Sequence, residues 1–151
     1  MLNKLLLIIS KIQHDIKNPS INKGGCVHFA YFLSKTLRKY GYKHHVVAMN
    51  KHIIFFNAEA SLQELLNYED GCSHLAVYIP KIGYIDAEKI VKNPYDFYRI
   101  SVATVKLPAD YDLNKLRRKP YWNLEYQKSY NKKLARIISE NFKQLKYERR
   151  H

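Results

Sequence analysis

The chain has 151 residues, which is the size of one domain that can bury an apolar core without a disulfide framework. Its 46% hydrophobic and 26% charged residues are ordinary for a globular protein and exclude a disordered, collagen-like or disulfide-knotted chain. Lys and Arg number 26 against 13 Asp and Glu, so the net charge is +13 and the chain should attract nucleic acid, acidic protein surfaces or anionic lipid. We expect a single domain over residues 1–151.

The first segment, residues 2–16, is predicted to be an amphipathic helix. Six apolar residues share one helical stripe: Leu2, Leu5, Leu6, Ile9, Ile12 and Ile16. The uninterrupted apolar run, residues 5–9, is shorter than the roughly 7–15 residues of a signal peptide and the about 20 residues of a membrane span. We therefore expect this helix to pack on the body of a cytoplasmic protein with no membrane contact, with a membrane anchor as the alternative.

The next elements follow from turn residues and apolar spacing. Residues 17–25 are rich in Asn, Ser, Pro and Gly and predict a loop. Apolar residues then recur at helical spacing over residues 26–40, and Gly41 is a helix stop. Further elements are predicted in chain order: strands at 45–50 and 52–57, a short helix at 58–66, and strands at 73–79, 83–88 and 98–107, the last ended by Pro108.

The last third of the chain is strongly basic. Residues 115–151 contain 12 basic residues and three acidic ones, so this segment carries +9 of the total +13. Eight residues recur at spacings of three and four: Trp122, Tyr126, Tyr130, Leu134, Ile137, Ile138, Asn141 and Leu145. The pattern predicts one long amphipathic helix with a basic outer face. Helices at both ends with antiparallel strands between them indicate an α+β fold.

Three positions combine into a chemically specific pattern. Gly24 and Gly25 precede Cys26 at the start of a predicted helix, where unpaired backbone N–H groups and the helix dipole favour a thiolate. The two glycines let a substrate backbone approach the sulfur, so they form the expected substrate cleft. His74 begins one predicted strand and Asp86 ends its hairpin partner. A nearby imidazole can take the thiol proton, and a carboxylate can orient that imidazole.

The hairpin between these strands decides whether the two side chains meet. His74 and Asp86 share a sheet face when the numbers of any two paired residues add up to an even number, because side chains alternate along a strand. A three-residue loop at residues 79–81 pairs Tyr78 with Ile82 and sets His74 opposite Asp86. A loop of two or four residues places them on opposite faces unless a bulge intervenes. The sequence leaves these registers open.

The motifs GGCVHFAYFLSKTL, HLAVYI and YIDAE together resemble the core of the papain-like and transglutaminase-like cysteine peptidase superfamily, and most closely its small bacteriophage-encoded members. The resemblance covers about residues 20–90. It implies that a Cys-bearing helix packs on a central antiparallel sheet, with Cys26 as nucleophile, His74 as general base and acid, and Asp86 as orienting carboxylate.

The resemblance also has departures. Ala76 stands where transglutaminases usually have Trp, and Ser20 stands where papain-type peptidases have the Gln that donates to the oxyanion. Asn22 is therefore the nearest amide for that role beside the Cys26 backbone N–H, and Gln13 is a weaker candidate.

Plainer interpretations remain open for each residue. Cys26 can be a buried structural thiol, His74 a packed strand histidine, Asp86 a turn residue and Asn22 a loop cap. The chain's two cysteines are expected to be free thiols in a reducing compartment, with a disulfide between Cys26 and Cys72 as the alternative.

Two Cys–His pairs and three further histidines raise the question of a metal site. Cys26 with His28, and Cys72 with His74, have zinc-type ligands, but residues 26 and 28 of one helix point about 200° apart, so no metal is expected. We expect His28 to line the cleft or face solvent, and three histidines to lie on the surface: His44, His45 and His52.

Two functions of different classes follow. The first is a cysteine hydrolase that acts on an amide or isopeptide bond of a protein or peptide through a thioester, without a cofactor. Acyl transfer to an amine is possible on the same core. The second is a non-catalytic viral binding module whose basic C-terminal helix docks on nucleic acid or an acidic host protein, in the host cytoplasm. The chain has no Walker loop, dinucleotide fingerprint or known nucleic-acid motif.

Overall fold

The computed structural model describes residues 2–16, 26–50, 74–98, 103–118 and 125–149. Within these residues the fold is α+β, with five helices and one antiparallel sheet of five strands in the order β4-β3-β2-β1-β5. The elements in chain order are α1 (Leu2–Asp15), α2 (Cys26–Lys39), β1 (His45–Asn50), β2 (His74–Ile79), β3 (Gly83–Ile85), β4 (Ile90–Val91), α4 (Tyr95–Tyr98), β5 (Ala103–Lys106), α5 (Leu113–Arg117) and α6 (Glu125–Arg149).

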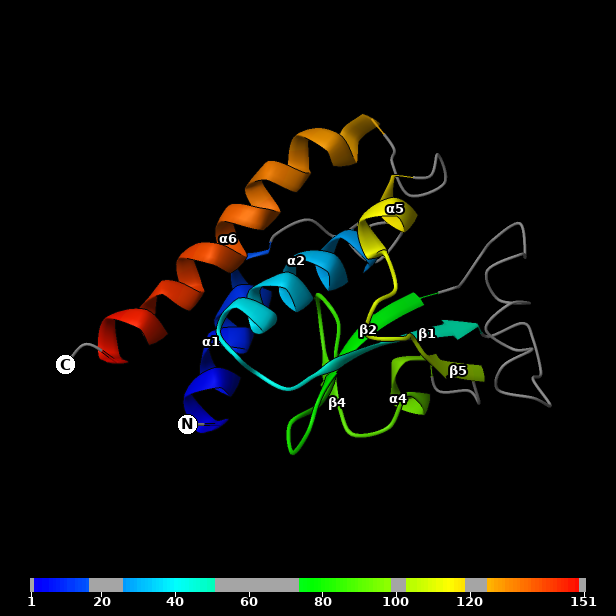
Figure 1. Ribbon diagram of the computed structural model, residues 1–151, viewed down its shortest axis with the longest axis horizontal. Helices are drawn as coiled ribbons and strands as arrows, with labels where there is room; N and C mark the ends of the chain where they lie inside the picture. Colours follow the sequence, from blue (N-terminus) through cyan, green and yellow to red (C-terminus); the bar gives the residue numbers. More distant parts are fainter. Residues whose placement is uncertain (1, 17–25, 51–73, 99–102, 119–124, 150–151) are drawn as a thin grey trace.

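Helix α2 is the centre of the fold. It packs on β1 and β2 through one face and contacts α5 and α6 through others (Figure 1). Phe29, Ala30, Leu33 and Leu37 are fully buried or nearly so, and they join residues of β2 such as Leu75 in one core. A second, smaller cluster lies on other strand positions and includes Val47, Met49 and Ala76. Because α2 is covered on several sides, both its ends are held at fixed places relative to the sheet.

The end of α2 confirms the predicted stop at Gly41. This glycine has a φ of 78°, a left-handed conformation that L side chains rarely adopt. Its N–H donates to the Arg38 carbonyl, and the Tyr42 N–H donates to the Leu37 carbonyl. These two bonds form a Schellman motif, which satisfies carbonyls at the end of the helix and turns the chain toward β1.

The N-terminal helix has the predicted extent but a different buried stripe. Its buried residues are Leu5, Ile8, Ile9 and Ile12. Leu2 and Leu6, which were expected on the stripe, are 36% and 38% exposed. Leu6 lies about 100° around the helix axis from Leu5, so it falls at the edge of the face that α1 presents to the core.

The β2–β3 hairpin settles the register that the sequence leaves open. Ile79 pairs with Gly83, so the loop spans the three residues 80–82. The loop has three residues, as in the alternative that places His74 and Asp86 on one face, but it lies one residue later, so residue 78 pairs with 84 and not with 82. Buried Ile79 stays in the ladder, and Lys81 takes the positive φ of 70° that the tight loop requires. The strand also ends at Ile85, three residues before its predicted end at residue 88.

The predicted strand at 98–107 needs correction at its first residue. Tyr98, expected to open this strand, is the last residue of the short helix α4. Residues 99–102 lie outside the described residues, and β5 covers Ala103–Lys106. The predicted strand at 52–57 and helix at 58–66 lie outside the described residues.

The C-terminal region contains the predicted long helix, α6, and before it a short helix, α5, which the sequence analysis did not predict. Helix α5 begins after Asp112, whose side chain caps it by accepting from the Lys115 N–H at 2.9 Å. Helix α6 begins at Glu125, and Trp122 lies outside the described residues. The predicted buried stripe is confirmed at Leu134, Ile138, Asn141 and Leu145, together with Phe142. Among the described helices, none is both long and apolar enough to cross a membrane.

Candidate active site

Cys26, His74 and Asp86 stand at the boundaries of their elements. Cys26 is the first residue of α2, His74 is the first residue of β2, and Asp86 directly follows β3. A side chain at the end of a helix or strand is less constrained by the regular geometry of that element, so the three side chains can point toward one another. All three are buried, with exposed fractions of 1%, 3% and 4%.

The His74–Asp86 contact is direct. His74 Nε2 donates to Asp86 Oδ2 at 2.9 Å, because a carboxylate oxygen can only accept. The other oxygen, Oδ1, accepts from the backbone N–H groups of Glu88 and Lys89 at 2.7 Å each. Both carboxylate oxygens are therefore held by donors, and the bond to Nε2 sets the orientation of the imidazole.

The same imidazole contacts the thiol of Cys26. Burial by itself would lower the pKa of His74, but hydrogen bonds to Asp86 and to Cys26, with the negative charges of the carboxylate and the thiolate, raise it to about 10. Because Nε2 is hydrogen-bonded to Asp86, Nδ1 is the ring nitrogen that can exchange a proton with the Cys26 sulfur. The arrangement favours an imidazolium beside an anionic partner, which is the charge distribution of an activated thiol–histidine pair.

Two further side chains hold the pair in place. The ring of Phe97 lies edge-on to His74, with centroids 5.4 Å apart. Gln13 of α1 donates from Nε2 to the backbone carbonyls of Asp86 and Lys89, at 2.9 Å in both cases. The turn that carries the carboxylate is thus fixed to a helix more than 70 residues earlier in the chain.

This role of Gln13 corrects the sequence analysis. The weaker oxyanion candidate uses its amide hydrogens on two carbonyls beside Asp86, so it supports the orienting carboxylate instead of a substrate oxygen. No local sequence pattern pairs Gln13 with a turn 73 residues away, so this contact could not be predicted. Asn22, Gly24 and Gly25 lie outside the described residues, so their predicted roles stay predictions.

The other histidines differ from their predicted places. His28 is 1% exposed, and its Nδ1 lies 3.3 Å from Asn131 Nδ2 of α6, so it neither faces solvent nor lines an open cleft. His44 and His45, expected on the surface, are half-buried and line a cavity. Their burial follows from the turn after α2, which folds back against that helix. His52 lies outside the described residues.

Metal and disulfide chemistry are constrained only in part. Over the described ranges, no group of three or more His, Cys, Asp or Glu side chains could hold a metal ion. Cys26 is a free thiol. The structure therefore does not contain the alternative disulfide between Cys26 and Cys72. Cys72 itself lies outside the described residues, and with it the second zinc-type pair.

Comparison of this chain with protein-family models, with curated proteins and with solved structures finds no match.

Proposed function

We propose that the chain is a cysteine hydrolase with a papain-like core, in which Cys26 is the nucleophile, His74 the general base and acid, and Asp86 the orienting carboxylate. The observation that carries the proposal is the buried imidazole of His74, which bonds to a carboxylate through one nitrogen and to the helix-opening thiol on its other side. A helix start, a strand start and a strand end supply the three groups, as expected for this superfamily.

The chemistry follows from these positions. The Cys26 thiolate attacks the carbonyl carbon of an amide or isopeptide bond, and the backbone N–H of the first helical residue, which has no acceptor within the helix, faces the developing oxyanion. The His74 imidazolium gives its proton to the leaving amine, and a thioester remains. Neutral His74 then takes a proton from water as the water oxygen attacks the thioester. The acid product leaves, and the imidazolium and thiolate are restored.

Thiol alkylation at pH 6 tests the proposal without a known substrate. An ordinary thiol is only about 0.3% ionised at this pH, so an activated thiolate should react roughly 10- to 100-fold faster than free cysteine with iodoacetamide. A small probe is appropriate because Cys26 is 1% exposed. Peptide mapping assigns the label to Cys26 or Cys72. Cys26 labelling at the rate of free cysteine, or slower, would contradict the proposal.

A matched pair of histidine variants separates activation from folding. H74Q should lower the alkylation rate of Cys26 at least about tenfold, because the thiolate loses its cationic partner. H28Q is the control, since His28 is equally buried on the same core but bonds to Asn131. Circular dichroism checks that both variants fold. Equal alkylation rates in H74Q and H28Q would show that the slower reaction of Cys26 comes from a disturbed core and not from loss of the His74 imidazolium.

The second candidate function is favoured by one observation, the exposed cations of α6. Lys132, Lys133, Arg136 and Lys143 are all exposed along this helix, with exposed Glu140 among them. Four phosphate contacts predict that affinity for duplex DNA falls about 100-fold from 50 to 200 mM salt. Fluorescence anisotropy with a labelled duplex measures this slope. A flat salt response, or no change in K132Q/R136Q, would eliminate nucleic-acid docking by α6.

A further inference from the structure

A second cluster of polar side chains lies at the opposite end of the sheet from Cys26 and His74. A cavity of ≈ 610 Å³ opens where β1 begins and β5 ends, between these strands, α2 and the segment before α5. His45 pairs with Tyr78 at this end, whereas Met49 pairs with His74 at the other, so the cavity is about four residues, or roughly 13 Å, along the strand from the candidate active site. Its volume is in the range of small-molecule sites.

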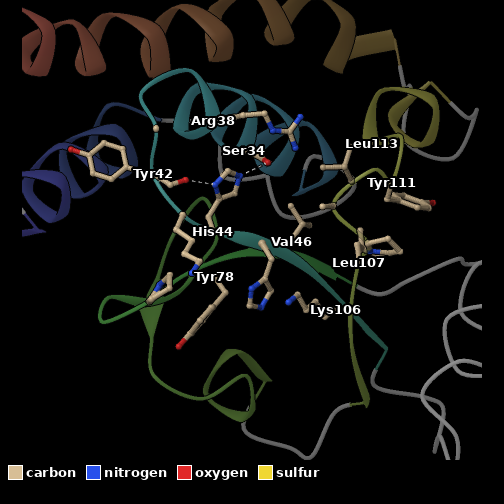
Figure 2. A pocket seen from close by; sticks show the side chains of 16 residues that line it. Ser34, Arg38, Tyr42, His44, Val46, Tyr78, Lys106, Leu107, Tyr111 and Leu113 are labelled. Atoms are coloured by element: carbon tan, nitrogen blue, oxygen red, sulfur yellow. Dashed lines mark hydrogen bonds between the residues drawn. The ribbon is translucent and has the colours of Figure 1, made fainter.

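The floor of the cavity is a bonded serine–histidine pair (Figure 2). The Ser34 hydroxyl and His44 Nε2 are 2.7 Å apart, and His44 Nδ1 lies 2.8 Å from the carbonyl of Tyr42. A carbonyl can only accept, so Nδ1 carries hydrogen, and Nε2 is the ring nitrogen that shares a hydrogen bond with the serine hydroxyl. The bonds fix the imidazole without any carboxylate. They leave the serine oxygen with lone pairs and a fixed position at the base of the cavity.

Three exposed cations line the same cavity, Arg38 on the α2 side of the sheet and Lys106 beyond β1 (Figure 2). Arg38 is one turn beyond Ser34 on α2, and Figure 2 shows its guanidinium on the same side as the hydroxyl. Lys43 and Lys106 line the cavity as well, and no Asp or Glu is among its described lining residues. Burial, followed by the positive charge of Lys106 and by His44, lowers the pKa of His45. The positive charge here is therefore concentrated and not neutralised by carboxylates of the lining, so the cavity suits an anion.

The remaining wall is apolar and aromatic. Val46 and Leu107 are buried, and Leu113 is half-buried beside them. Tyr78 and Tyr111 flank the opening with half-buried rings. A simple inorganic anion would use only the cationic part of this surface. The apolar wall next to it favours a ligand with a flat apolar body joined to the charged group.

We propose that this cavity binds a small molecule in which an anionic group, a phosphate or a carboxylate, is joined to an aromatic body. Arg38 and Lys106 bind the anion, the Ser34–His44 pair lies beneath it, and Val46 and Leu107 contact the ring. The site binds and does not hydrolyse, because Ser34 lies inside α2, where neighbouring backbone N–H groups are used by the helix and cannot stabilise an oxyanion. The proposal is independent of the thiol chemistry at Cys26.

Calorimetric titration with four probes tests the ligand class. Phenyl phosphate and benzoate carry both halves of the proposed ligand, inorganic phosphate has only the anion, and benzyl alcohol has only the ring. At least one of the first two should bind saturably below about 1 mM and at least fivefold more tightly than inorganic phosphate or benzyl alcohol. Which of them binds more tightly identifies the anion. Equal affinity for inorganic phosphate, or no saturable binding of either aromatic anion, would overturn the proposal.

Charge-matched variants place the binding in the cavity. R38Q/K106Q should weaken the tighter aromatic anion at least tenfold. K39Q/K132Q removes the same charge from exposed positions outside the cavity lining and should change the affinity less than twofold. C26S should bind as the wild type does. Equal weakening by the two double variants would show that only net charge matters and would overturn the proposed site. Loss of binding in C26S would also overturn it, because the ligand would then bind at the candidate active site.

Discussion

His74 and His44 lie at opposite ends of one sheet and are held in opposite ways. His74 is buried and bonded to a carboxylate whose second oxygen also has backbone donors. His44 is half-buried and bonded to a hydroxyl and a carbonyl, with cations nearby. A buried anion beside an imidazole stabilises the imidazolium and suits proton transfer. A neutral hydroxyl and a carbonyl only orient the ring, and the cations around it select a ligand. Our two proposals, thiol chemistry at one end of the sheet and anion binding at the other, rest on this difference between the partners of the two histidines.

The largest expected effect on stability is at the carboxylate. Asp86→Ala removes the acceptor of three hydrogen bonds and leaves His74 and two backbone N–H groups without it. The free energy of unfolding should fall by about 3–5 kcal/mol, as for removal of one partner from a buried ion pair. Urea unfolding at pH 7 measures the loss. A cost below about 1 kcal/mol would mean that the carboxylate is not engaged as described.

The second prediction concerns pH. The pKa of His74 is raised to about 10 in the folded chain against about 6.5 in the unfolded chain, so its contribution to stability is full below pH 6.5 and is lost as pH rises toward 10. The unfolding free energy of wild type should exceed that of H74Q most at pH 6. The gap should narrow by up to about 1.4 kcal/mol per pH unit above pH 6.5. Urea unfolding of both proteins at pH 6, 8 and 9.5 measures it, and a constant or widening gap would contradict the ion pair.

The third prediction tests the hairpin that places Asp86. A Cβ on Gly83 would lie 2.5 Å from the Val91 carbonyl oxygen, and φ is 128° there. G83A should therefore destabilise the fold by about 2–3 kcal/mol and slow alkylation of Cys26. G41A is the control, because φ is also positive but no atom lies within 4 Å, so about 1 kcal/mol is expected. Thermal unfolding ranks the two, and a larger loss in G41A would reverse the argument.

The smallest expected effect is at the other end of the sheet. Ser34→Ala removes one neutral hydrogen bond to His44 and should cost about 1 kcal/mol. Alkylation of Cys26 at pH 6 should stay within about twofold of wild type, because Ser34 lies about two helical turns from Cys26 and bonds to His44 at the other end of the sheet. A fall in alkylation as large as that of H74Q would show that the ends are coupled through α2.

Much of the fold was predictable because its signals are local. Gly41 ends a helix by its own conformation, and the strand signals of residues 73–79 and 83–88 place His74 and Asp86 on neighbouring strands of one hairpin. The register of that hairpin could not be chosen from the sequence, since the positive φ of Lys81 and the close approach of Gly83 to Val91 exist only in the folded hairpin. Helices and strands of two to five residues, such as β4, are too short to show a period.

The supporting contacts of the site were not predictable for a different reason. Gln13 meets Asp86 across 73 positions, and His28 meets Asn131 across 103. Nothing in the neighbouring residues of either partner encodes such a pair. The cavity at the other end was unpredictable for the same reason. Its residues Ser34, His45 and Lys106 come from three elements, and they lie near one another only when β5 pairs with β1 and α2 packs on the sheet. The papain-like assignment and the oxyanion role of Asn22 stay predictions.

Helix α6 has a consequence for how the chain folds. Its Asn141 donates to Asp15 across 126 positions, and its apolar side packs over α1 and α2 (Figure 1). During synthesis the first two helices leave the ribosome long before α6 exists, with Ile12 and Phe29 still without their final cover. Contacts of such long range form slowly, because loop closure must precede them. The apolar faces of α1 and α2 therefore stay exposed in the nascent chain until α6 docks, and exposed apolar surface of this kind favours aggregation.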